Sequence, residues 1–310
     1  MGSRDISIII NPNAGNGSTG KKWPKIKALA RDRLGPFQEY ITAGPGHGKT
    51  LTIEAIAKGA RLVVCIGGDG TLNEVINGIM EYGHDIQSEL VLGFVPDGTG
   101  CDFVRTVAIP RNVEQAIDVI AAHHVCSIDL GRLFFKDHTG RDCYRYFQNI
   151  TSLGLGGEVD QRVNNTTKFF GPFLSFIWAT LISIFLYGKK KIHLKIDDVI
   201  ENEFTIWNVA VANGQYFGGG MQIAPDASID DGLFDVTVVG DLSLPEVFLN
   251  LPKLYNGKIK SVDKVVTFTG KKIVASSDQR VLLDVDGEQP GTLPVSLDIF
   301  PGALNIITAK

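Results

Sequence analysis

A glycine-rich turn that carries one carboxylate lies at residues 67–71, where the sequence reads Gly-Gly-Asp-Gly-Thr. An apolar run precedes it at residues 62–66, and residues 72–76 continue in a pattern typical of a helix. A turn between a strand and a helix points backbone N–H groups at an anion, and glycines let that anion come close. The positive end of the helix dipole adds to the attraction. The turn therefore predicts a phosphate site, and Asp69 supplies a carboxylate suited to an accompanying metal ion.

Two further turns follow predicted strands and support this site. Residues 11–17 are small, polar and flexible, which suits a loop under a nucleotide, although an ordinary loop explains them better when they are taken alone. Residues 96–100 read Pro-Asp-Gly-Thr-Gly and follow an apolar run, so they form a second Gly-Thr turn. The carboxyl ends of parallel strands lie at one edge of a sheet. The turns at 67–71 and 96–100 are therefore predicted to converge on one phosphate chain.

The turn at residues 43–50 offers a competing phosphate site. Its sequence, Ala-Gly-Pro-Gly-His-Gly-Lys-Thr, fits a relaxed P-loop pattern with Ala in place of the first Gly. Asp69 would then end the strand that supplies a magnesium-binding carboxylate. Against this alternative, Pro45 removes one of the N–H donors that cradle phosphate in a P-loop. We therefore favour a site built from several turns of one sheet.

Two acidic turns lie in the second half of the chain. Residues 228–233 form a tight Asp-Gly turn whose carboxylates and free carbonyl groups suit a hard cation such as magnesium, although a simple hairpin turn explains them equally well. Residues 281–288 read as a strand that ends in Asp286-Gly287-Glu288. A carboxylate at such a strand end can accept a hydroxyl proton during phosphoryl transfer. By itself this turn too is explained by a hairpin.

The elements that must position these turns alternate between strand and helix over the first part of the chain. Strands are predicted at 5–10, 37–42, 62–66 and 90–95, and helices at 22–34, 50–58, 71–82 and 113–122. This alternation predicts a parallel sheet with helices on both faces. Short β-rich segments with turn residues follow, among them 144–150 and 205–212, and they predict an antiparallel sandwich or barrel. We expect an α/β domain at 1–125 and a β-rich domain at 126–310, whose last strand can return to the first domain.

Composition indicates an ordinary globular protein. Of the 310 residues 44% are hydrophobic, and the formal net charge of −4 argues against a dedicated nucleic-acid binder. The four cysteines form no CxxC pair, so we interpret them as reduced thiols of a cytosolic protein. No signal peptide is recognised, because a predicted strand at residues 5–10 leads straight into a turn.

One uncharged segment, residues 169–187, is followed by lysines at 189–191. Its length and the flanking charge qualify it as a candidate for a membrane span. Gly171 and Pro172 dilute it, however, and strand-like segments continue on both sides. We favour a long helix, partly buried and partly available to lipid, whose lysines can meet anionic headgroups.

Taken in order, these segments resemble the diacylglycerol kinase catalytic family, which includes bacterial lipid kinases and sphingosine and ceramide kinases. The resemblance covers nearly the whole chain and rests on Asn11-Pro12 with Ala14-Gly15, Thr42 with Gly46-His47, Gly67 to Val75, Pro96 to Phe103, Asp231-Gly232 and Asp286-Gly287-Glu288. The glycine–aspartate turn alone is shared with NAD kinases and phosphofructokinases, so the ordered set is much more specific. The resemblance implies an α/β domain like theirs, followed by a β-sandwich domain, with ATP and lipid meeting in a cleft.

The resemblance also implies the roles of individual residues. Those implied to contact ATP are Asn11, Pro12, Asn13, Ala14, Gly15, Thr42, Gly67, Gly68, Asp69, Gly70, Thr71, Leu72, Asn73 and Thr99. Asp231, with the carbonyl groups of Ser228 and Leu233, is implied to bind Mg²⁺. Asp286 or Glu288 is implied to act as the base on the lipid hydroxyl.

Two positions depart from the family, which usually has Leu and Asn where this chain has Asp97 and Cys101. Asp97 adds negative charge near a phosphate site, which weakens nucleotide binding unless a metal ion or a Lys or Arg compensates. Cys101 lacks the amide donor and acceptor that Asn supplies at this position in the family. These departures favour one alternative, a catalytically weak member that binds nucleotide or lipid.

The sequence as a whole predicts an ATP-dependent lipid kinase that phosphorylates a hydroxyl of diacylglycerol or of a related lipid. A kinase of a soluble substrate, similar to NAD kinase, is the second enzymatic alternative, but it gives the segment 169–187 no role. The protein is expected to be cytoplasmic, to contact the inner membrane face peripherally and to bind no nucleic acid. The sequence leaves a homodimer open.

Overall fold

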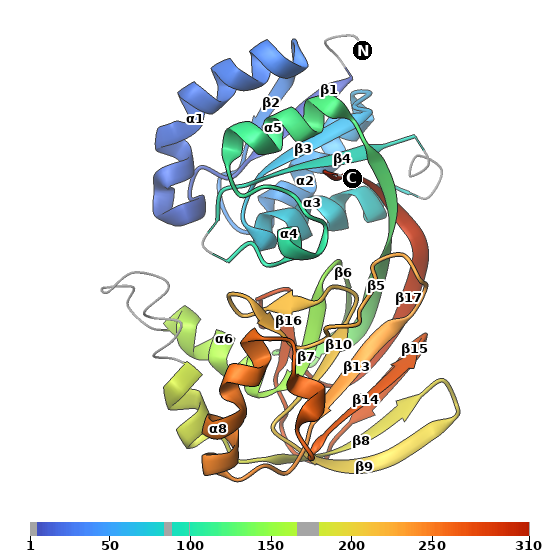
Figure 1. Ribbon diagram of the computed structural model, residues 1–310. Helices are drawn as coiled ribbons and strands as arrows, with labels where there is room; N and C mark the ends of the chain where they lie inside the picture. Colours follow the sequence, from blue (N-terminus) through green and yellow to red (C-terminus); the bar gives the residue numbers. More distant parts are fainter. Residues whose placement is uncertain (1–4, 84–88, 99, 166–179, 310) are drawn as a thin grey trace. The chain divides into compact units, whose positions relative to one another are not determined.

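The computed structural model describes residues 5–83, 89–98, 100–165 and 180–309 (Figure 1). The chain divides into two compact units, the first made of Met1–Leu130 with Pro301–Lys310 and the second of Gly131–Phe300. The boundary expected after residue 125 lies after Leu130, because one long strand, β5 (Val125–Asp137), contributes residues to both units.

The first unit contains a parallel sheet covered by helices. Its elements are β1 (Ile6–Ile10), α1 (Ala14–Leu34), β2 (Gln38–Ile41), α2 (His47–Ala57), β3 (Leu62–Gly67), α3 (Asp69–Tyr82), β4 (Val91–Pro96), α4 (Phe103–Thr106), α5 (Val113–Ala122) and the end of β17 (Gly291–Ile307). The strand order is β2-β1-β3-β4-β17, and all of these pairs are parallel. Figure 1 shows α1 and α5 on one face of the sheet and α2 and α3 on the other. Strands β1 and β3 are buried along their whole length because both faces of the sheet are covered, and all residues of β1 except Ser7 are apolar.

The second unit consists mainly of antiparallel strands. Its remaining elements are β6 (Asp142–Phe147), β7 (Ile150–Gly154), α6 (Leu155–Asn165), β8 (Lys190–Ile196), β9 (Ile200–Ile206), β10 (Asn208–Ala212), β11 (Tyr216–Phe217), β12 (Met221–Gln222), β13 (Phe234–Val239), α8 (Leu244–Tyr255), the 3₁₀ turn η2 (Ile259–Ser261), β14 (Val265–Gly270), β15 (Lys272–Ser276) and β16 (Leu283–Val285). One sheet has the order β14-β13-β10-β7-β16. The other contains β17-β15-β8-β9, and β5 pairs with β6 beside β17.

Side chains from both sheets of the second unit form one hydrophobic core. Along β8 the buried residues Ile192, Leu194 and Ile196 alternate with polar ones, as expected for a strand with one covered face. The rings of Phe147 and Phe234 stack across this core with centroids 5.7 Å apart. The parallel sheet of the first unit and the sandwich of the second confirm the fold class predicted from the sequence.

Two segments predicted as single strands are each divided between the two sheets. Residues 144–150 contain the end of β6 and the start of β7, and residues 205–212 contain the end of β9 and all of β10. Trp207 lies at the second corner, where its backbone N–H donates to Val239 (2.9 Å) and its Nε1 to the carbonyl of Leu242 (2.8 Å). The prediction was wrong here because apolar periodicity continues through a corner while the backbone pairing changes.

Two expectations fall wholly or largely outside the described residues. Thr99 is one of them, and most of the apolar segment 169–187 is the other. Within the described part of that segment, residues 180–186 are helical. Among the described residues, no helix combines the length and the apolar character needed to cross a membrane.

Candidate functional site

The turns after β1, β3 and β4 meet at one edge of the sheet in the first unit. Asn11 connects the first two turns, because its backbone N–H donates to Ile66 (3.0 Å) and its Nδ2 donates to Thr71 Oγ1 (2.9 Å). The backbone N–H of Asp97 donates to the carbonyl of Gly67 at 2.8 Å and joins the third turn to the second. The strand order therefore brings together turns that are far apart in the sequence.

Glycines allow unusually close approach of backbone at this meeting point. A Cβ atom added to Gly98 would lie 2.5 Å from the Cα atom of Gly68, a distance that real Cβ atoms do not adopt. A Cβ atom on Gly15, whose φ is 55°, would lie 3.2 Å from the carbonyl oxygen of Asp97. Main chain without side chains is thus exposed where the three turns meet, and phosphate groups can approach such a surface closely.

Helix α3 begins at this same point. Its N-cap residue, Gly68, has an extended conformation and, as a glycine, supplies no side chain to cap the helix. The first N–H groups of a helix have no partner within the helix, and they carry its positive dipole end. An anion placed at the start of α3 would therefore meet free donors and favourable charge.

Asp69, in the first turn of α3, has an unusual electrostatic environment. Its Oδ2 accepts a hydrogen bond from the backbone N–H of Asp102 at 3.0 Å. Its Oδ1 is buried and has no hydrogen-bond partner among the described residues. The pKa of Asp69 is raised from 3.8 to about 6, chiefly by loss of hydration and to a smaller extent by the charge of Asp102, although backbone N–H donors and Arg111 lower it.

The raised pKa of Asp69 predicts that stability depends on pH. The folded state holds this proton more strongly than the unfolded state, so the free energy of unfolding falls as the pH rises from about 4 to about 6. The difference between 3.8 and about 6 corresponds to about 3 kcal/mol. In Asp69→Asn we expect this pH-dependent decrease in the free energy of unfolding to be absent. Urea unfolding of the nucleotide-free protein at several pH values measures the decrease. The exposed substitution Asp32→Asn serves as the control, and equal pH profiles for wild type and Asp69→Asn would contradict the prediction.

The two positions that depart from the family lie in the turn after β4. Lys22 Nζ lies 2.7 Å from Asp97 Oδ1, so a half-exposed lysine compensates the added negative charge of a largely buried carboxylate. The Oδ2 atom of Asp97 is buried without a partner among the described residues. Burial raises the pKa of the Cys101 thiol to about 12, which keeps it neutral. Arg111 donates to the carbonyl groups of Gly100 and Cys101 and fixes the turn.

The turn after β2 is not arranged as a P-loop. Glu74 of α3 accepts hydrogen bonds from the backbone N–H groups of Gly46 (2.6 Å) and Gly48 (2.8 Å). Its carboxylate thus occupies the donors that would hold a phosphate. Lys49 pairs with Glu81 and does not fold over the loop. The P-loop alternative is wrong, because the carboxylate of Glu74 already occupies the N–H groups at the start of α2.

Three other residues implied to contact ATP are buried. The backbone N–H of Thr42 donates to the carbonyl of Ile10 at 2.9 Å at the end of β2. The side chain of Leu72 lies in the core, and the amide of Asn73 accepts from Asn77 Nδ2 at 3.1 Å. The polar side chains that the structure gathers at the three turns are those of Asn11, Asp69 and Thr71, of which Thr71 is itself buried and accepts from Asn11 Nδ2.

In the second unit, Asp286 is fixed by three backbone donors. Its Oδ2 accepts from the N–H of Gln148 (3.1 Å), and its Oδ1 accepts from the N–H groups of Asn149 (3.1 Å) and Ile150 (3.0 Å). The residue is buried and has a left-handed backbone with φ of 50°. These bonds stabilise the carboxylate anion and hold it in one orientation.

A second buried carboxylate, Asp284, was missed from the sequence. Its Oδ2 accepts from Ser152 Oγ at 3.1 Å and its Oδ1 from the N–H of Gly287 at 2.9 Å. The Asp-Val-Asp spacing of residues 284–286 matches the two-residue period of a strand, and this signal could have identified it.

Glu288 differs from both aspartates, because it is half-exposed and faces a cation. Its Oε2 lies 2.7 Å from a guanidinium nitrogen of Arg145. Backbone bonds between Val285 and Glu288 in both directions, at 2.8 and 3.0 Å, close the turn that holds it. Of the two residues implied to act as base, Asp286 is thus held by backbone N–H groups and Glu288 by an ion pair with Arg145.

The turn at residues 228–233 is held by its own side chains. Asp231 Oδ1 accepts from the backbone N–H of Leu233 at 3.0 Å, and Ser228 Oγ donates to Asp230 at 2.6 Å. One carboxylate with carbonyl oxygens is a donor set that suits Mg²⁺, which keeps several water ligands. No group of three or more His, Cys, Asp or Glu side chains within the described ranges is placed to share a metal ion. A metal site at this turn would therefore depend on backbone carbonyl groups.

Negative charge accumulates beside this turn. Burial, together with the charges of Asp231 and Asp226, raises the pKa of Asp235 from 3.8 to about 6. Lys260 lowers it and forms an ion pair with Asp226. A bound cation would relieve this repulsion, so the residues present fit the ion implied by the resemblance.

Two family models match the chain. The diacylglycerol kinase catalytic domain matches residues 5–133, and the YegS C-terminal NAD kinase beta sandwich-like domain matches residues 149–308. The chain belongs to the diacylglycerol kinase family. It is therefore a member of a family of lipid kinases, and the family predicted from the sequence is confirmed.

Relatives of nearly full length support this membership. The diacylglycerol kinase of Staphylococcus carnosus is 27% identical over 307 residues, covering 98% of this chain and 94% of the relative. That of Staphylococcus saprophyticus is 29% identical over 291 residues, covering 93% and 90%.

Solved structures show the same fold. A diacylglycerol kinase from Bacillus anthracis has a TM-score of 0.71 at 23% identity and covers 98% of this chain and 97% of its own. An NAD kinase from Archaeoglobus fulgidus, solved in complex with ATP, has a TM-score of 0.52 at 10% identity and covers 98% and 94%.

Proposed function

We propose that this lipid kinase transfers a phosphoryl group from ATP to a hydroxyl of diacylglycerol or of a related lipid, as a peripheral protein at a membrane. The observation that carries the proposal is the meeting of three glycine-rich turns at the start of α3, in a chain that belongs to the diacylglycerol kinase family.

The nucleotide part of the proposal rests on the first unit. The uncapped N–H groups of α3 attract the phosphates, and Gly68 and Gly98 leave room for them. The Oδ1 atom of Asp69 and the Oδ2 atom of Asp97, which have no hydrogen-bond partner in the part of the chain that the structure describes, are acceptors for hydroxyl or amino groups of the nucleotide. Lys22 offsets the charge of Asp97, so this departure from the family is compatible with ATP binding.

The phosphoryl-transfer part of the proposal rests on the second unit. Asp286 or Glu288 accepts the proton of the lipid hydroxyl, and positioning with charge neutralisation supplies the rest of the catalysis. The three N–H bonds of Asp286 fix the orientation of its carboxylate, whereas Glu288 keeps a half-exposed carboxylate beside Arg145. Asp231 and the carbonyl groups of Ser228 and Leu233 would hold Mg²⁺, which supplies positive charge when bound.

The test is transfer of radiolabelled phosphate from ATP to a panel of acceptors, with and without a magnesium chelator. The panel contains diacylglycerol, a sphingoid base, ceramide and phosphatidylglycerol in mixed micelles, and NAD without detergent. We expect a lipid acceptor to be phosphorylated in the presence of magnesium. Transfer to NAD alone would instead indicate a soluble-substrate kinase, and binding without transfer to any acceptor would indicate a member that has lost turnover.

A further inference from the structure

Helix α8 (Leu244–Tyr255) carries more apolar side chains than the fold buries. Seven of its twelve residues are Leu, Val, Phe or Tyr, yet none of its residues is buried. A surface helix of a globular protein normally places its apolar residues on one face that packs against the core. The apolar residues of α8 must therefore be distributed over more than the packed face.

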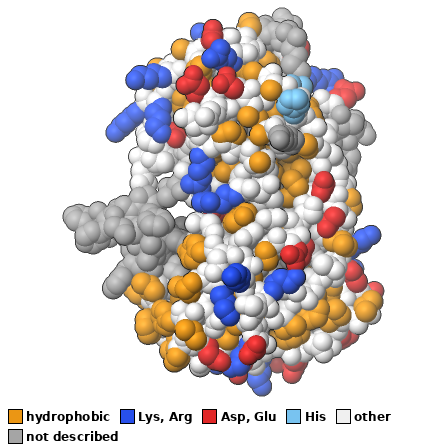
Figure 2. Space-filling view, viewed as in Figure 1, with side chains coloured by type: hydrophobic (Ala, Val, Ile, Leu, Met, Phe, Trp, Pro, Cys, Tyr) orange, Lys and Arg blue, Asp and Glu red, His pale blue; other side chains and the backbone are white. Residues whose placement is uncertain are grey.

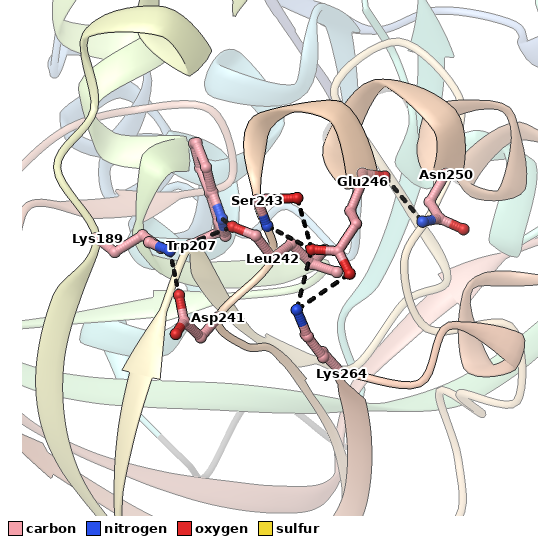
Figure 3. Close-up of polar contacts among 8 residues, drawn as sticks. All are labelled: Lys189, Trp207, Asp241, Leu242, Ser243, Glu246, Asn250 and Lys264. Carbon is pink, nitrogen blue, oxygen red and sulfur yellow. Dashed lines mark hydrogen bonds and ion pairs between the residues drawn. The ribbon is translucent and has the colours of Figure 1, made fainter.

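Two faces of α8 are occupied. On the first, Val247, Phe248 and Leu254 pack against the hydrophobic cluster of the second unit that contains Trp207 and Leu242. On the second, Glu246 accepts from Ser243 at the start of the helix and pairs with Lys264 at 2.9 Å, while Asn250 donates to the carbonyl of Glu246 at 2.8 Å (Figure 3).

The third face of α8 is apolar and exposed. Pro245, Leu249 and Pro252 follow one another at i, i+4 and i+7, so they share one side of the helix. All three are exposed, and the side chain of Leu249 is 79% exposed. An exposed leucine by itself is ordinary, but an apolar row along a whole helix face is typical of an interaction surface.

Residues just before β8 extend this face. Phe185 and Leu186 are 63% and 64% exposed, and the ring of Phe185 lies 5.4 Å from the ring of Phe248 on α8. We call Phe185, Leu186, Pro245, Leu249 and Pro252 together the apolar patch. Figure 2 shows hydrophobic side chains gathered over the part of the second unit that contains α8.

The start of α8 is fixed to the same segment. The carbonyl oxygen of Leu242 accepts from Trp207 Nε1 at 2.8 Å and from Lys189 Nζ at 3.3 Å, and Lys189 also pairs with Asp241 (Figure 3). The helix therefore keeps a defined orientation relative to the lysines at the start of β8.

Positive charge borders the apolar patch. Lys190 Nζ lies 6.0 Å from the ring centroid of Tyr187, which follows Leu186 directly. Among the described residues, neither Lys190 nor Lys191 forms an ion pair with a carboxylate. An apolar row near lysines whose charge no described carboxylate neutralises matches the pattern of helices that lie in a membrane interface and attract anionic headgroups.

We propose that the apolar patch, together with Lys190 and Lys191, which follow Phe185 and Leu186 in the chain at the start of β8, docks onto a bilayer surface that contains anionic lipids. The proposal rests on the proposed function, because a kinase of diacylglycerol meets its substrate in a bilayer. A second copy of this chain fits the patch less well, since paired lysines would then face each other.

Sedimentation with vesicles tests the proposal on the full chain without ATP or substrate. For the double variant Phe185→Ser/Leu249→Ser, binding to vesicles of phosphatidylcholine and phosphatidylglycerol is expected to fall by about tenfold or more, because two exposed apolar side chains no longer enter lipid. The matched control is Val199→Ser, which changes a side chain that is 86% exposed at the opposite end of β8. For Lys190→Gln/Lys191→Gln, binding is expected to fall by about tenfold on these vesicles and to stay unchanged on phosphatidylcholine alone.

Kinase assays separate docking from catalysis. The serine double variant is expected to lose activity on diacylglycerol embedded in vesicles and to keep wild-type activity on water-dispersed short-chain diacylglycerol. Failure of wild type on both acceptors would overturn the proposed function, while the vesicle-binding result would still decide docking. Wild-type vesicle binding by the serine double variant would overturn the docking proposal. The proposal would also be overturned if the wild type were a dimer and the serine double variant a monomer, because the patch would then join two copies of the chain.

Discussion

Asp286→Asn is expected to lower the turnover on diacylglycerol by about 10²- to 10⁴-fold, because a neutral amide cannot accept the hydroxyl proton. Asn is the substitution that disturbs the backbone least, since it tolerates the left-handed conformation at φ of 50°. Its Oδ1 can still accept from the N–H groups of Asn149 and Ile150, while its Nδ2 then faces the N–H of Gln148. The accompanying loss of stability is expected to be about 1–3 kcal/mol.

A matched control for this variant lies in the same unit. Asp197 also has a left-handed backbone, with φ of 52°, and its Oδ1 accepts from the backbone N–H groups of Lys271 (2.9 Å) and Lys272 (2.7 Å). Asp197→Asn should therefore weaken a comparable clamp and leave turnover unchanged. Turnover and urea unfolding are measured on both variants.

Glu288→Gln completes this comparison. If turnover of Asp286→Asn follows only its folded fraction, Asp286 is a structural clamp, and loss of turnover in Glu288→Gln would identify Glu288 as the base. Wild-type turnover in both variants would rule out the proposed base at this turn.

Local patterns were sufficient to predict the sheet of the first unit, whereas for the second they predicted a sandwich or a barrel and the family resemblance favoured the sandwich. Uninterrupted apolar runs such as residues 62–66 identify strands covered on both faces, and Gly-rich turns after them identify the functional edge. Glycines at 68 and 98 could be recognised because close approach of backbone requires them.

Contacts between distant residues could not be predicted in the same way. Asp97 looked like an uncompensated charge, and its partner Lys22 lies 75 residues earlier on α1. The turn after β2 fits a relaxed P-loop pattern, and the sequence does not reveal that Glu74, 26 residues after Gly48, occupies its donors. Both findings depend on which helices pack beside which turns, and no local pattern encodes that.

The proposed nucleotide site predicts a second large effect, which arises from backbone packing alone. Gly98→Ala places a Cβ atom 2.5 Å from the Cα atom of Gly68 and 3.2 Å from its backbone nitrogen. No change of rotamer relieves a contact with main chain, so one turn must move away from the other. Such overpacking typically costs about 1–3 kcal/mol. Because Gly68 precedes the first N–H groups of α3, the displacement is expected to lower ATP affinity by about 10- to 100-fold.

Gly44→Ala is the matched control, since a Cβ atom on Gly44 meets nothing within 4 Å and the residue does not have a positive φ. It changes the same residue type in the turn after β2, whose donors are already occupied by Glu74. Calorimetric titration with ATP and magnesium should therefore give wild-type affinity for Gly44→Ala and weakened affinity for Gly98→Ala. Thermal unfolding is measured on both variants to verify that they are folded. Equal affinities in the two variants would mean that nucleotide binds away from the turns at 67–71 and 96–100. In that case the close approach of Gly68 and Gly98 would serve only the packing of the sheet edge.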